Sequence, residues 1–206
     1  FKKKKFDLII NLAAQAGVRY SITNPSEYIK SNVNGFSNII ELSRLYKIKK
    51  IIYASSSSVY GEKKIFPLRE NIKLEPKNIY SLSKKNNEDM AEIYSRYYNM
   101  NFIGLRFFTI YGEWGRPDML ILKYVISKFR NKKFYLYNHG NHYRDFTYVG
   151  DAIKAITLLV TKKLKNKNEI FNICSNNPVS LLNILKKLNN NFGSPFIVKK
   201  KKETAD

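Results

Sequence analysis

A tyrosine and a lysine four residues apart, Tyr80 and Lys84, are the side chains of this chain best suited to chemistry. They belong to the segment YSLSK, and on a helix two positions four apart lie on the same face. An ammonium group held beside a phenol favours the phenolate, so such a tyrosine can exchange a proton nearer to neutral pH. The pair therefore predicts a proton-transfer site for an alcohol that is being oxidised, provided that a bound group accepts the hydride.

A serine cluster upstream of the pair strengthens this prediction. Residues 51–61 read IIYASSSSVYG, which is an apolar strand pattern that ends in four serines. A hydroxyl at the end of a strand can hydrogen-bond the same substrate oxygen as the tyrosine. The YxxxK spacing alone arises often by chance, but together with the serine cluster it is a specific signal.

The elements that must position these residues indicate an α/β fold. Residues 6–13 (FDLIINLA) form a near-continuous apolar run, as a buried parallel strand requires. Asn24, Pro25 and Glu27 predict a helix start, with Asn24 as N-cap. Strands alternating with helices indicate a largely parallel sheet. Further strands are predicted at 50–55, 101–107 and 169–173, and helices at about 25–46, 80–98, 118–130, 150–164 and 180–191.

Composition limits the class of protein to which the chain can belong. With 206 residues, 44% of them hydrophobic, the chain is long enough to bury one substantial core. No apolar run approaches the roughly 18 residues needed to cross a bilayer, so we expect no membrane partner. The single cysteine, Cys174, excludes an internal disulfide framework and suits a reducing cytoplasm. His139 and His142 lack neighbouring carboxylates or cysteines on a helix, so we expect no metal site.

The formal net charge of +21 makes a nucleic-acid-binding protein one alternative. However, most of the positive charges are lysines, whereas base and phosphate readout draws heavily on arginine. The lysines are scattered or stand at the ends of predicted elements, as in residues 2–5, 162–167 and 199–202. We therefore expect no nucleic-acid partner and attribute the charge to a surface that reflects an AT-rich genome.

Six segments resemble the extended short-chain dehydrogenase/reductase family of nucleotide-sugar enzymes, and most of all its UDP-glucuronate 4-epimerases. They are NLAAQAGVRYSITNP, SNVNG, YASSSSVYG, YSLSK, LRFFTIYGEWGRPDM and YRDFTYVGD, and they follow in the order of the family. The resemblance implies an NAD-binding, Rossmann-like, doubly wound parallel sheet with part of a smaller C-terminal substrate domain. It implies that residues 1–110 form part of the NAD-binding domain. Residues 111–206 would contribute a truncated substrate domain, with residues 140–175 returning in part to the sheet.

The activity implied by the resemblance is epimerisation of UDP-glucuronate to UDP-galacturonate through a transient 4-keto sugar, with NAD as cofactor. The alternative is that the substrate is another UDP-sugar, such as UDP-glucose or UDP-galactose. Family members often dimerise through two helices per subunit, which implies a homodimer built through the helices near 25–46 and 80–98.

Site residues are carried over from the family only where this sequence matches its motifs. The resemblance implies Tyr80 as the base, Lys84 as its partner and as a ligand of the nicotinamide ribose, and Ser56 as the assisting hydroxyl. Cofactor contacts are implied at Leu12, Ala13, Ala14, Gln15, Asn32, Tyr53, Tyr80, Lys84 and Phe107. Substrate contacts are implied at Arg19, Ser57, Ser58, Thr109, Arg116, Tyr137 and Arg144.

For some of these residues a plainer interpretation stays open. The alanines suit simple helix–sheet packing almost as well, Arg19 suits a solvated surface, and Tyr137 suits a core position in place of the uracil ring contact. Arg144 matches the arginine of the family that binds the diphosphate, and a guanidinium suits that role through bidentate hydrogen bonds.

Three hydroxyl side chains distinguish subfamilies. Related 4,6-dehydratases carry acidic residues just after the catalytic Ser/Thr, and decarboxylases carry glutamate at the position of Ser58. UDP-glucose epimerases usually carry asparagine at the position of Thr109. Here Ser57, Ser58 and Thr109 are all small hydroxyls, as expected for binding a carboxylate on C5. Such binding is needed because the oxidised sugar is a β-keto acid, which loses CO2 easily.

The glycine-rich cofactor fingerprint of the family, GxxGxxG, is absent from the 206 residues. A βαβ unit takes roughly 30 residues, so we expect about two units to be missing before Phe1 and the substrate domain to continue after Asp206. We therefore expect a fragment or a truncated gene product that binds NAD poorly and is inactive alone. A non-catalytic remnant is the alternative from a different class of function.

Overall fold

The computed structural model describes residues 1–2, 4–64, 66–192 and 198–201, and it divides into two units. The first unit comprises residues 1–108 and 154–173, and the second comprises residues 109–153 and 174–206. Among the helices of the described part of the chain, none combines the length and the apolar character that a membrane span needs.

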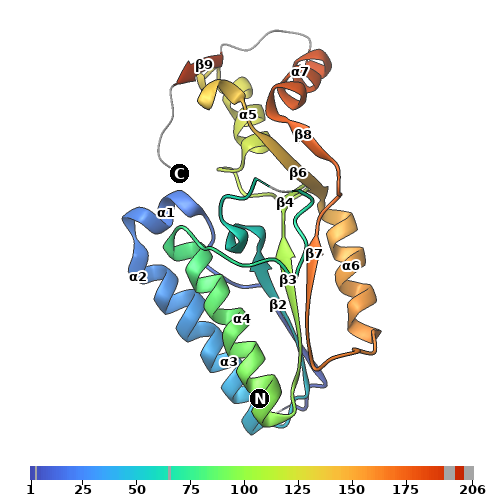
Figure 1. The fold of residues 1–206 in the computed structure, drawn as a ribbon. Coiled ribbons are helices and arrows are strands. Elements are labelled where there is room, and N and C mark those ends of the chain that lie inside the picture. Colours follow the sequence, from blue (N-terminus) through green and yellow to red (C-terminus); the bar gives the residue numbers. More distant parts are fainter. Residues whose placement is uncertain (3, 65, 193–197, 202–206) are drawn as a thin grey trace. The chain divides into compact units, whose positions relative to one another are not determined.

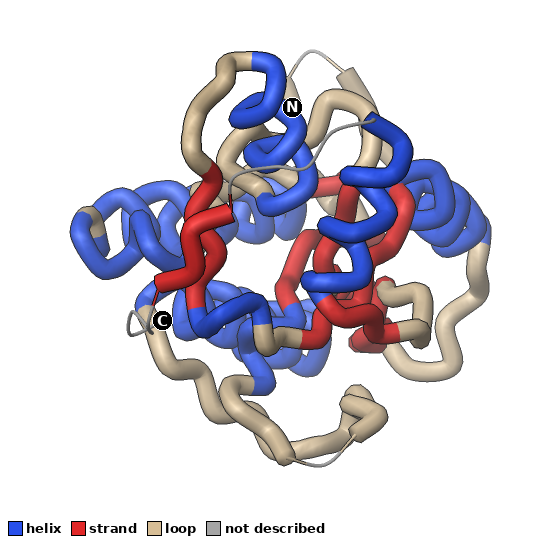
Figure 2. Tube along the Cα trace, turned by 90° about the horizontal axis from the view of Figure 1, so that it is seen from above, coloured by secondary structure: helices blue, strands red, loops and turns tan. Residues whose placement is uncertain are grey.

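The first unit is built on a four-stranded parallel sheet with the strand order β1–β2–β3–β7 (Figure 1). Its strands are β1 (Leu8–Asn11), β2 (Lys50–Ser56), β3 (Asn101–Phe107) and β7 (Asn168–Ile173). Because all four strands are parallel, their carboxyl ends meet at one edge of the sheet, where open α/β sheets bind their ligands. Helical segments connect β1 to β2 and β2 to β3, and this confirms the predicted α/β fold. Figure 2 shows the helices and strands of the chain in different colours.

Helices cover both faces of this sheet (Figure 1). One face carries α1 (Val18–Thr23), α2 (Pro25–Tyr28), the π-helical turn η1 (Ile29–Asn34), α3 (Gly35–Leu45) and α4 (Ile79–Tyr98). The other face carries α6 (Val149–Thr161), which belongs to this unit from Lys154 onward. Lys50 on β2 ties α6 to the sheet, because its Nζ donates to the carbonyls of Leu159, Val160 and Lys162 at 2.9, 2.7 and 3.0 Å. A cation is favourable there, since the carbonyls at the C-terminal end of a helix carry partial negative charge.

The core of the first unit lies between the sheet and the helices α3 and α4. It is an apolar cluster in which the side chains are almost completely shielded from solvent. Removing such side chains from water is the main favourable term in folding, which explains why these strands and helices stay together. The cluster comprises Phe36, Ile40, Ile51, Tyr53, Ala91, Met100 and Phe102.

The described residues of the second unit form short strands, two complete helices and the first residues of α6. Strand β4 (Thr109–Tyr111) pairs parallel to β6 (Tyr143–Tyr148), and β6 pairs antiparallel to β8 (Pro178–Ser180). Strand β5 (Phe134–Tyr137) pairs parallel to β9 (Val198–Lys201). Helices α5 (Leu120–Phe129) and α7 (Leu181–Phe192) enclose a small core of Tyr124, Phe134, Leu136 and Leu185. The remaining elements are the 3-10 turns η2 (Ser57–Tyr60) of the first unit and η3 (Asn138–Gly140) of the second.

Two expectations from the sequence need correction. The helix predicted over residues 25–46 is interrupted by the π-helical turn η1, and the side chain of Asn24 makes no capping hydrogen bond. Strand β1 forms an edge of the described sheet, so Ile10 is 43% exposed, although the apolar run predicts a buried strand. In both cases the apolar pattern predicts the type of element correctly. It does not show where the helix changes its backbone hydrogen bonds, or that β1 has only one neighbouring strand in the described sheet.

Candidate active site

Helix α4 begins with a capping box that fixes the position of Tyr80. The side chain of Asn78 accepts the backbone N–H of Ser81 at 2.9 Å, and Ser81 Oγ accepts the N–H of Asn78 at 3.2 Å. These two bonds satisfy backbone donors that the start of a helix leaves without intrahelical partners. Tyr80 is the second residue of the helix, and its ring meets that of Tyr28 edge to face, with 6.0 Å between the ring centroids.

Lys84 lies one turn further along α4 and is almost completely buried, with 3% of its surface exposed. Its Nζ donates a hydrogen bond of 2.8 Å to the carbonyl of Ala54 on β2. Burial lowers the pKa of Lys84 from 10.5 to about 8, because the charged form loses its hydration. The amine is therefore mostly protonated at neutral pH, and it loses its charge when the pH rises only slightly above neutral.

Ser56 ends β2 and marks the turn from the strand into η2. Its backbone is extended, and its Oγ accepts hydrogen bonds from Ser58 N at 3.2 Å and from Ser58 Oγ at 2.9 Å. A hydroxyl that accepts in this way still has its own O–H to donate. Ser56 and Ser58 thus form a small hydroxyl pair at the carboxyl end of the strand.

A pocket of about 240 Å³ brings these residues together within the first unit. Its polar members come from β2 and α4, and its apolar members come from the segment after β1, from Ala54 on β2 and from the end of β3. It lies at the carboxyl ends of the strands, where ligands bind in open parallel sheets. The lining residues are Leu12, Ala14, Ala16, Ala54, Ser55, Ser56, Tyr80, Lys84, Phe107 and Phe108.

Asn32 holds the segment after β1 against α4. Its Oδ1 accepts the N–H of Gln15 at 2.7 Å, while its Nδ2 donates to the Gln15 carbonyl and to Ser83 Oγ, both at 2.9 Å. Ser83 Oγ in turn donates to the carbonyl of Tyr80 at 2.7 Å. Tyr28, four residues before Asn32, donates from its hydroxyl to the carbonyl of Gly17 at 2.6 Å. The sequence marks Asn32 and Gln15 as cofactor contacts, and the structure uses the Asn32 side chain to fix the wall of the pocket.

Not all predicted cofactor residues line this pocket. Leu12, Ala14 and Phe107 line the pocket. Ala13 lies between Leu12 and Ala14 in the chain, but it is exposed and is not one of the residues described as lining the pocket. Tyr53 is fully buried in the core, its ring 5.0 Å from that of Phe36, and its hydroxyl has no hydrogen-bond partner among the described residues. The structure therefore gives Tyr53 a packing position, because alternate side chains of a strand point to opposite faces.

The predicted substrate residues are divided between the two units. Ser57 and Ser58 lie half-buried in η2, next to Ser56, while Arg19 lies exposed on α1. In the second unit, Thr109 opens β4 opposite Phe146 of β6.

The other residues predicted to contact substrate belong to the second unit. Arg116 is exposed, and its guanidinium binds both carboxylate oxygens of Asp118. Arg144 is exposed on β6, and the next residue, Asp145, accepts the backbone N–H groups of Ser175 and Asn177 at 2.8 and 3.0 Å. The side chain of Tyr137 lies outside what the structure describes.

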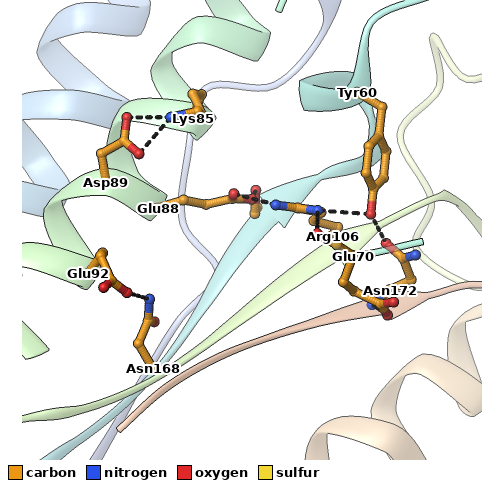
Figure 3. A network of polar contacts seen from close by, with 10 residues as sticks. Tyr60, Glu70, Lys85, Glu88, Asp89, Glu92, Arg106, Asn168 and Asn172 are labelled. Carbon is orange, nitrogen blue, oxygen red and sulfur yellow. Dashed lines mark hydrogen bonds and ion pairs between the residues drawn. The ribbon is translucent and has the colours of Figure 1, made fainter. Parts of the chain in front are cut away.

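Sequence reasoning missed one group of buried polar residues that borders the pocket. Glu88 on α4 and Arg106 on β3 form an ion pair that also contacts Ser55, one of the lining residues (Figure 3). The four-residue spacing from Tyr80 to Lys84 to Glu88 was the available signal. In the described residues, no cluster of three or more His, Cys, Asp or Glu side chains is arranged to hold a metal ion.

A family model and several known proteins match this chain. The model of the NAD dependent epimerase/dehydratase family matches residues 1–174. Protein CapI of Staphylococcus aureus is 44% identical, over 94% of this chain and 63% of its own length. UDP-glucuronate 4-epimerase 4 of Arabidopsis thaliana is 42% identical, over 75% of this chain and 36% of its own length. The chain thus spans less than two thirds of the length of these curated relatives.

A solved structure also matches the fold. UDP-glucuronic acid 4-epimerase from Bacillus cereus, in complex with UDP-glucuronic acid and NAD, superposes with a TM-score of 0.90 at 28% identity. The match covers 96% of this chain and 63% of that one.

Proposed function

This chain belongs to the NAD dependent epimerase/dehydratase family, and on that premise we propose that the gene's full product interconverts UDP-glucuronate and UDP-galacturonate by epimerisation at C4. The observation that carries the proposal is the pocket in which Tyr80, Lys84 and Ser56 meet at the carboxyl ends of the strands. The relatives that carry UDP-glucuronate in their names support this choice of substrate.

The pocket suits the nicotinamide end of NAD. Ala14 and Ala16 have small side chains that let a flat ring approach closely, and Leu12 and Phe107 supply apolar surface. An ammonium has three N–H donors, so Lys84 can bond the Ala54 carbonyl and a ribose hydroxyl at the same time. When bound, NAD accepts the hydride from C4 of the sugar and returns it later in the cycle.

Tyr80 moves the proton of the 4-hydroxyl in both directions. As a phenolate it takes this proton while the C4–H bond breaks, and C4 becomes a ketone. Ser56 donates a hydrogen bond to the same oxygen, and the Lys84 ammonium stabilises the phenolate. After the keto sugar has turned over, Tyr80 returns the proton to the oxygen as the hydride returns to the opposite face. The sugar is inverted at C4 and undergoes no net oxidation.

Three hydroxyl side chains support a uronate as the substrate. The Ser58 hydroxyl is hydrogen-bonded to that of Ser56, Ser57 lies between them in the chain, and Thr109 stands where other epimerases are expected to carry asparagine. Hydroxyl groups can hydrogen-bond a carboxylate without adding a negative charge beside it. We propose that the small hydroxyls at these three positions favour a uronate substrate, because a carboxylate bound by hydroxyls can be kept out of the geometry in which the 4-keto acid would lose CO2.

We further propose that the product acts as a homodimer through α3 and α4. Both helices expose apolar side chains: Leu45 on α3 is 57% exposed, and Ile93 and Tyr97 on α4 are 47% and 70% exposed. Exposed apolar side chains that gather on neighbouring helices are typical of a protein interface. A reducing cytoplasm is the proposed location, because the single Cys174 is compatible with it.

The substitution Tyr80→Phe tests the function at its central group. It removes the proton acceptor and leaves the ring, so we expect the epimerisation rate to fall by about 10² to 10⁴-fold while the affinity for UDP-sugar is retained. The measurement is the rate of UDP-galacturonate formation, with sugar affinity followed by calorimetry. The matched control is Tyr46→Phe at the end of α3, which should keep full activity. Full activity in Tyr80→Phe would contradict the proposal.

A further inference from the structure

A buried ion pair lies beneath the helix that carries Tyr80 and Lys84 (Figure 3). The guanidinium of Arg106 binds the carboxylate of Glu88 with two hydrogen bonds, Nε to Oε1 at 2.9 Å and Nη2 to Oε2 at 2.7 Å. Arg106 is 4% exposed and Glu88 is 6% exposed. Taking two charges out of water is costly, and such a pair often contributes little net stability. The chemistry proposed above does not use either residue, so the pair needs another explanation.

Glu88 joins the active-site helix to two strands at once. It follows Lys84 by four residues, so both side chains lie on the face of α4 that contacts the sheet. Ser55 on β2 and Arg106 on β3 stand directly opposite each other in the parallel register. Ser55 Oγ donates to Glu88 Oε1 at 2.5 Å, beside the two bonds from Arg106. The carboxylate is therefore held by neighbouring residues of two adjacent strands.

This arrangement determines where α4 lies along β2. Ser55 follows Ala54, whose carbonyl accepts the bond from Lys84, and it precedes Ser56. The helix is thus attached to β2 at two points one helical turn apart, Lys84 to Ala54 and Glu88 to Ser55. A slide of the helix by one turn, about 5.4 Å, would break both attachments together.

The same arginine also fixes the loop that enters α4. Arg106 Nη1 donates to Tyr60 Oη at 2.9 Å and to the carbonyl of Glu70 at 3.0 Å, and its guanidinium carbon lies 4.8 Å from the centre of the Tyr60 ring. The Tyr60 hydroxyl donates to Asn172 Oδ1 on β7 at 2.7 Å. Figure 3 shows these groups in one continuous line from α4 to β7. Arg106 on β3 therefore contacts the helix and the loop directly, and the network reaches β2 through Glu88 and Ser55 and β7 through Tyr60 and Asn172.

We propose that the Glu88–Arg106 pair is a positioning element of the candidate active site, which fixes α4 on β2 so that the Lys84 ammonium stays at the Ala54 carbonyl beside Tyr80. Neither residue of the pair touches the reacting atoms in this account. The proposal rests on the proposed function for the role of Lys84, but its geometry can be tested without substrate or cofactor.

The test reads the environment of Lys84 directly. In the 206-residue chain labelled with ¹³Cε-lysine, NMR titration follows each lysine, and the Lys84→Met variant identifies the signal of Lys84. The double substitution Glu88→Leu with Arg106→Leu removes both charges together, so no lone buried charge is left. We expect this variant to fold and the Lys84 midpoint to rise by about one pH unit or more, because a loosened helix admits water to the amine.

Two further variants make the result decisive. Ser55→Ala removes one bond to Glu88 and leaves both charges, so it should fold and raise the midpoint by less, in the same direction. Met100→Ala is the matched control, since it destabilises the core of the same unit without touching the network and should leave the midpoint unchanged.

The proposal is overturned by an unchanged Lys84 midpoint in the folded double variant, or in Ser55→Ala if the double variant does not fold. An equal shift in Met100→Ala would overturn it as well, because general loosening would then explain the effect. A shifted midpoint together with full activity of Tyr80→Phe would support the positioning role and reject the proposed function, so the two failures are distinguishable.

Discussion

Lys84 is the residue whose charge most directly controls the proposed proton transfer. Its folded pKa of about 8 lies below the ordinary 10.5 because burial penalises the charged form. Below pH 8 the ammonium is present and favours the Tyr80 phenolate, and above it the amine is neutral and that support is lost. The lowered pKa of Lys84 thus limits the proposed proton transfer to pH values below about 8.

We therefore expect kcat/KM for epimerisation to fall as the pH rises through about 8. The measurement is a pH–rate profile of the gene's full product from about pH 6 to about pH 10. The matched variant is Lys84→Arg, whose guanidinium stays charged over this range, so any activity that it retains should lack the fall near pH 8. If kcat/KM of Lys84→Arg falls at the same pH, the titration of a group other than Lys84 causes the loss of activity.

Thr109 is the residue at which the choice of a uronate substrate can be tested. If its hydroxyl helps to hold the C5 carboxylate, Thr109→Ala should release more CO2 from the 4-keto acid and increase the share of UDP-pentose. Chromatography of the products gives the ratio of UDP-pentose to UDP-galacturonate. Thr109→Ser keeps the hydroxyl and should retain the original ratio, and an equal ratio in all three proteins would remove the carboxylate role.

Individual side chains show where sequence reasoning reaches its limit. Residue types and spacing predict Tyr80, Lys84 and a serine of the cluster as one site, and the family resemblance selects Ser56. These three residues meet in one pocket. The motif match predicts that Tyr53 contacts the cofactor, but its side chain packs in the core. A motif match does not show to which face of a strand a side chain points. Glu88 and Arg106 are 18 residues apart in the chain, and their pairing depends on how α4 lies on the sheet.

At the level of elements, the sequence predicts the long strand β3 and the long helix α4 well. The sequence predicts the bounds of β3 correctly, because this strand is a continuous buried run. It predicts those of α4 to within one residue at its start, although the face that α4 buries is mostly polar. The π-helical turn η1 and the short strands of the second unit were not predicted. The short strands pair with residues distant in the chain, as β6 does with β8, and such pairings leave no periodic signal.

Helix α4 also carries the prediction about assembly. Replacing Ile93 and Tyr97 by glutamate places charges on its exposed apolar face, so we expect a proposed dimer of the gene's full product to dissociate into monomers. Light scattering after size-exclusion chromatography gives the mass. The control is Phe129→Glu, which changes an equally exposed aromatic residue on α5 in the second unit and should leave the mass unchanged. A monomeric parent protein, or an unchanged dimer, would reject the interface.

At the level of the whole molecule, the parallel sheet and the family match point to the same account. The carboxyl ends of β1, β2 and β3 and the start of α4 provide the pocket, and the family model covers residues 1–174. What distinguishes the proposed reaction from other ways of inverting C4 is that the hydrogen lost from this carbon comes back to it. A mechanism through ionisation of a C–H bond would exchange that hydrogen with solvent.

The most direct measurement is therefore ¹H NMR of UDP-glucuronate incubated with the gene's full product in D2O, with UDP-glucose in a parallel sample. We predict that UDP-galacturonate appears with protium at C4, because the hydride returns from the bound cofactor, and that UDP-glucose is converted much more slowly. Deuterium at C4 of the product, preferential conversion of UDP-glucose, or no UDP-galacturonate at all would contradict the account.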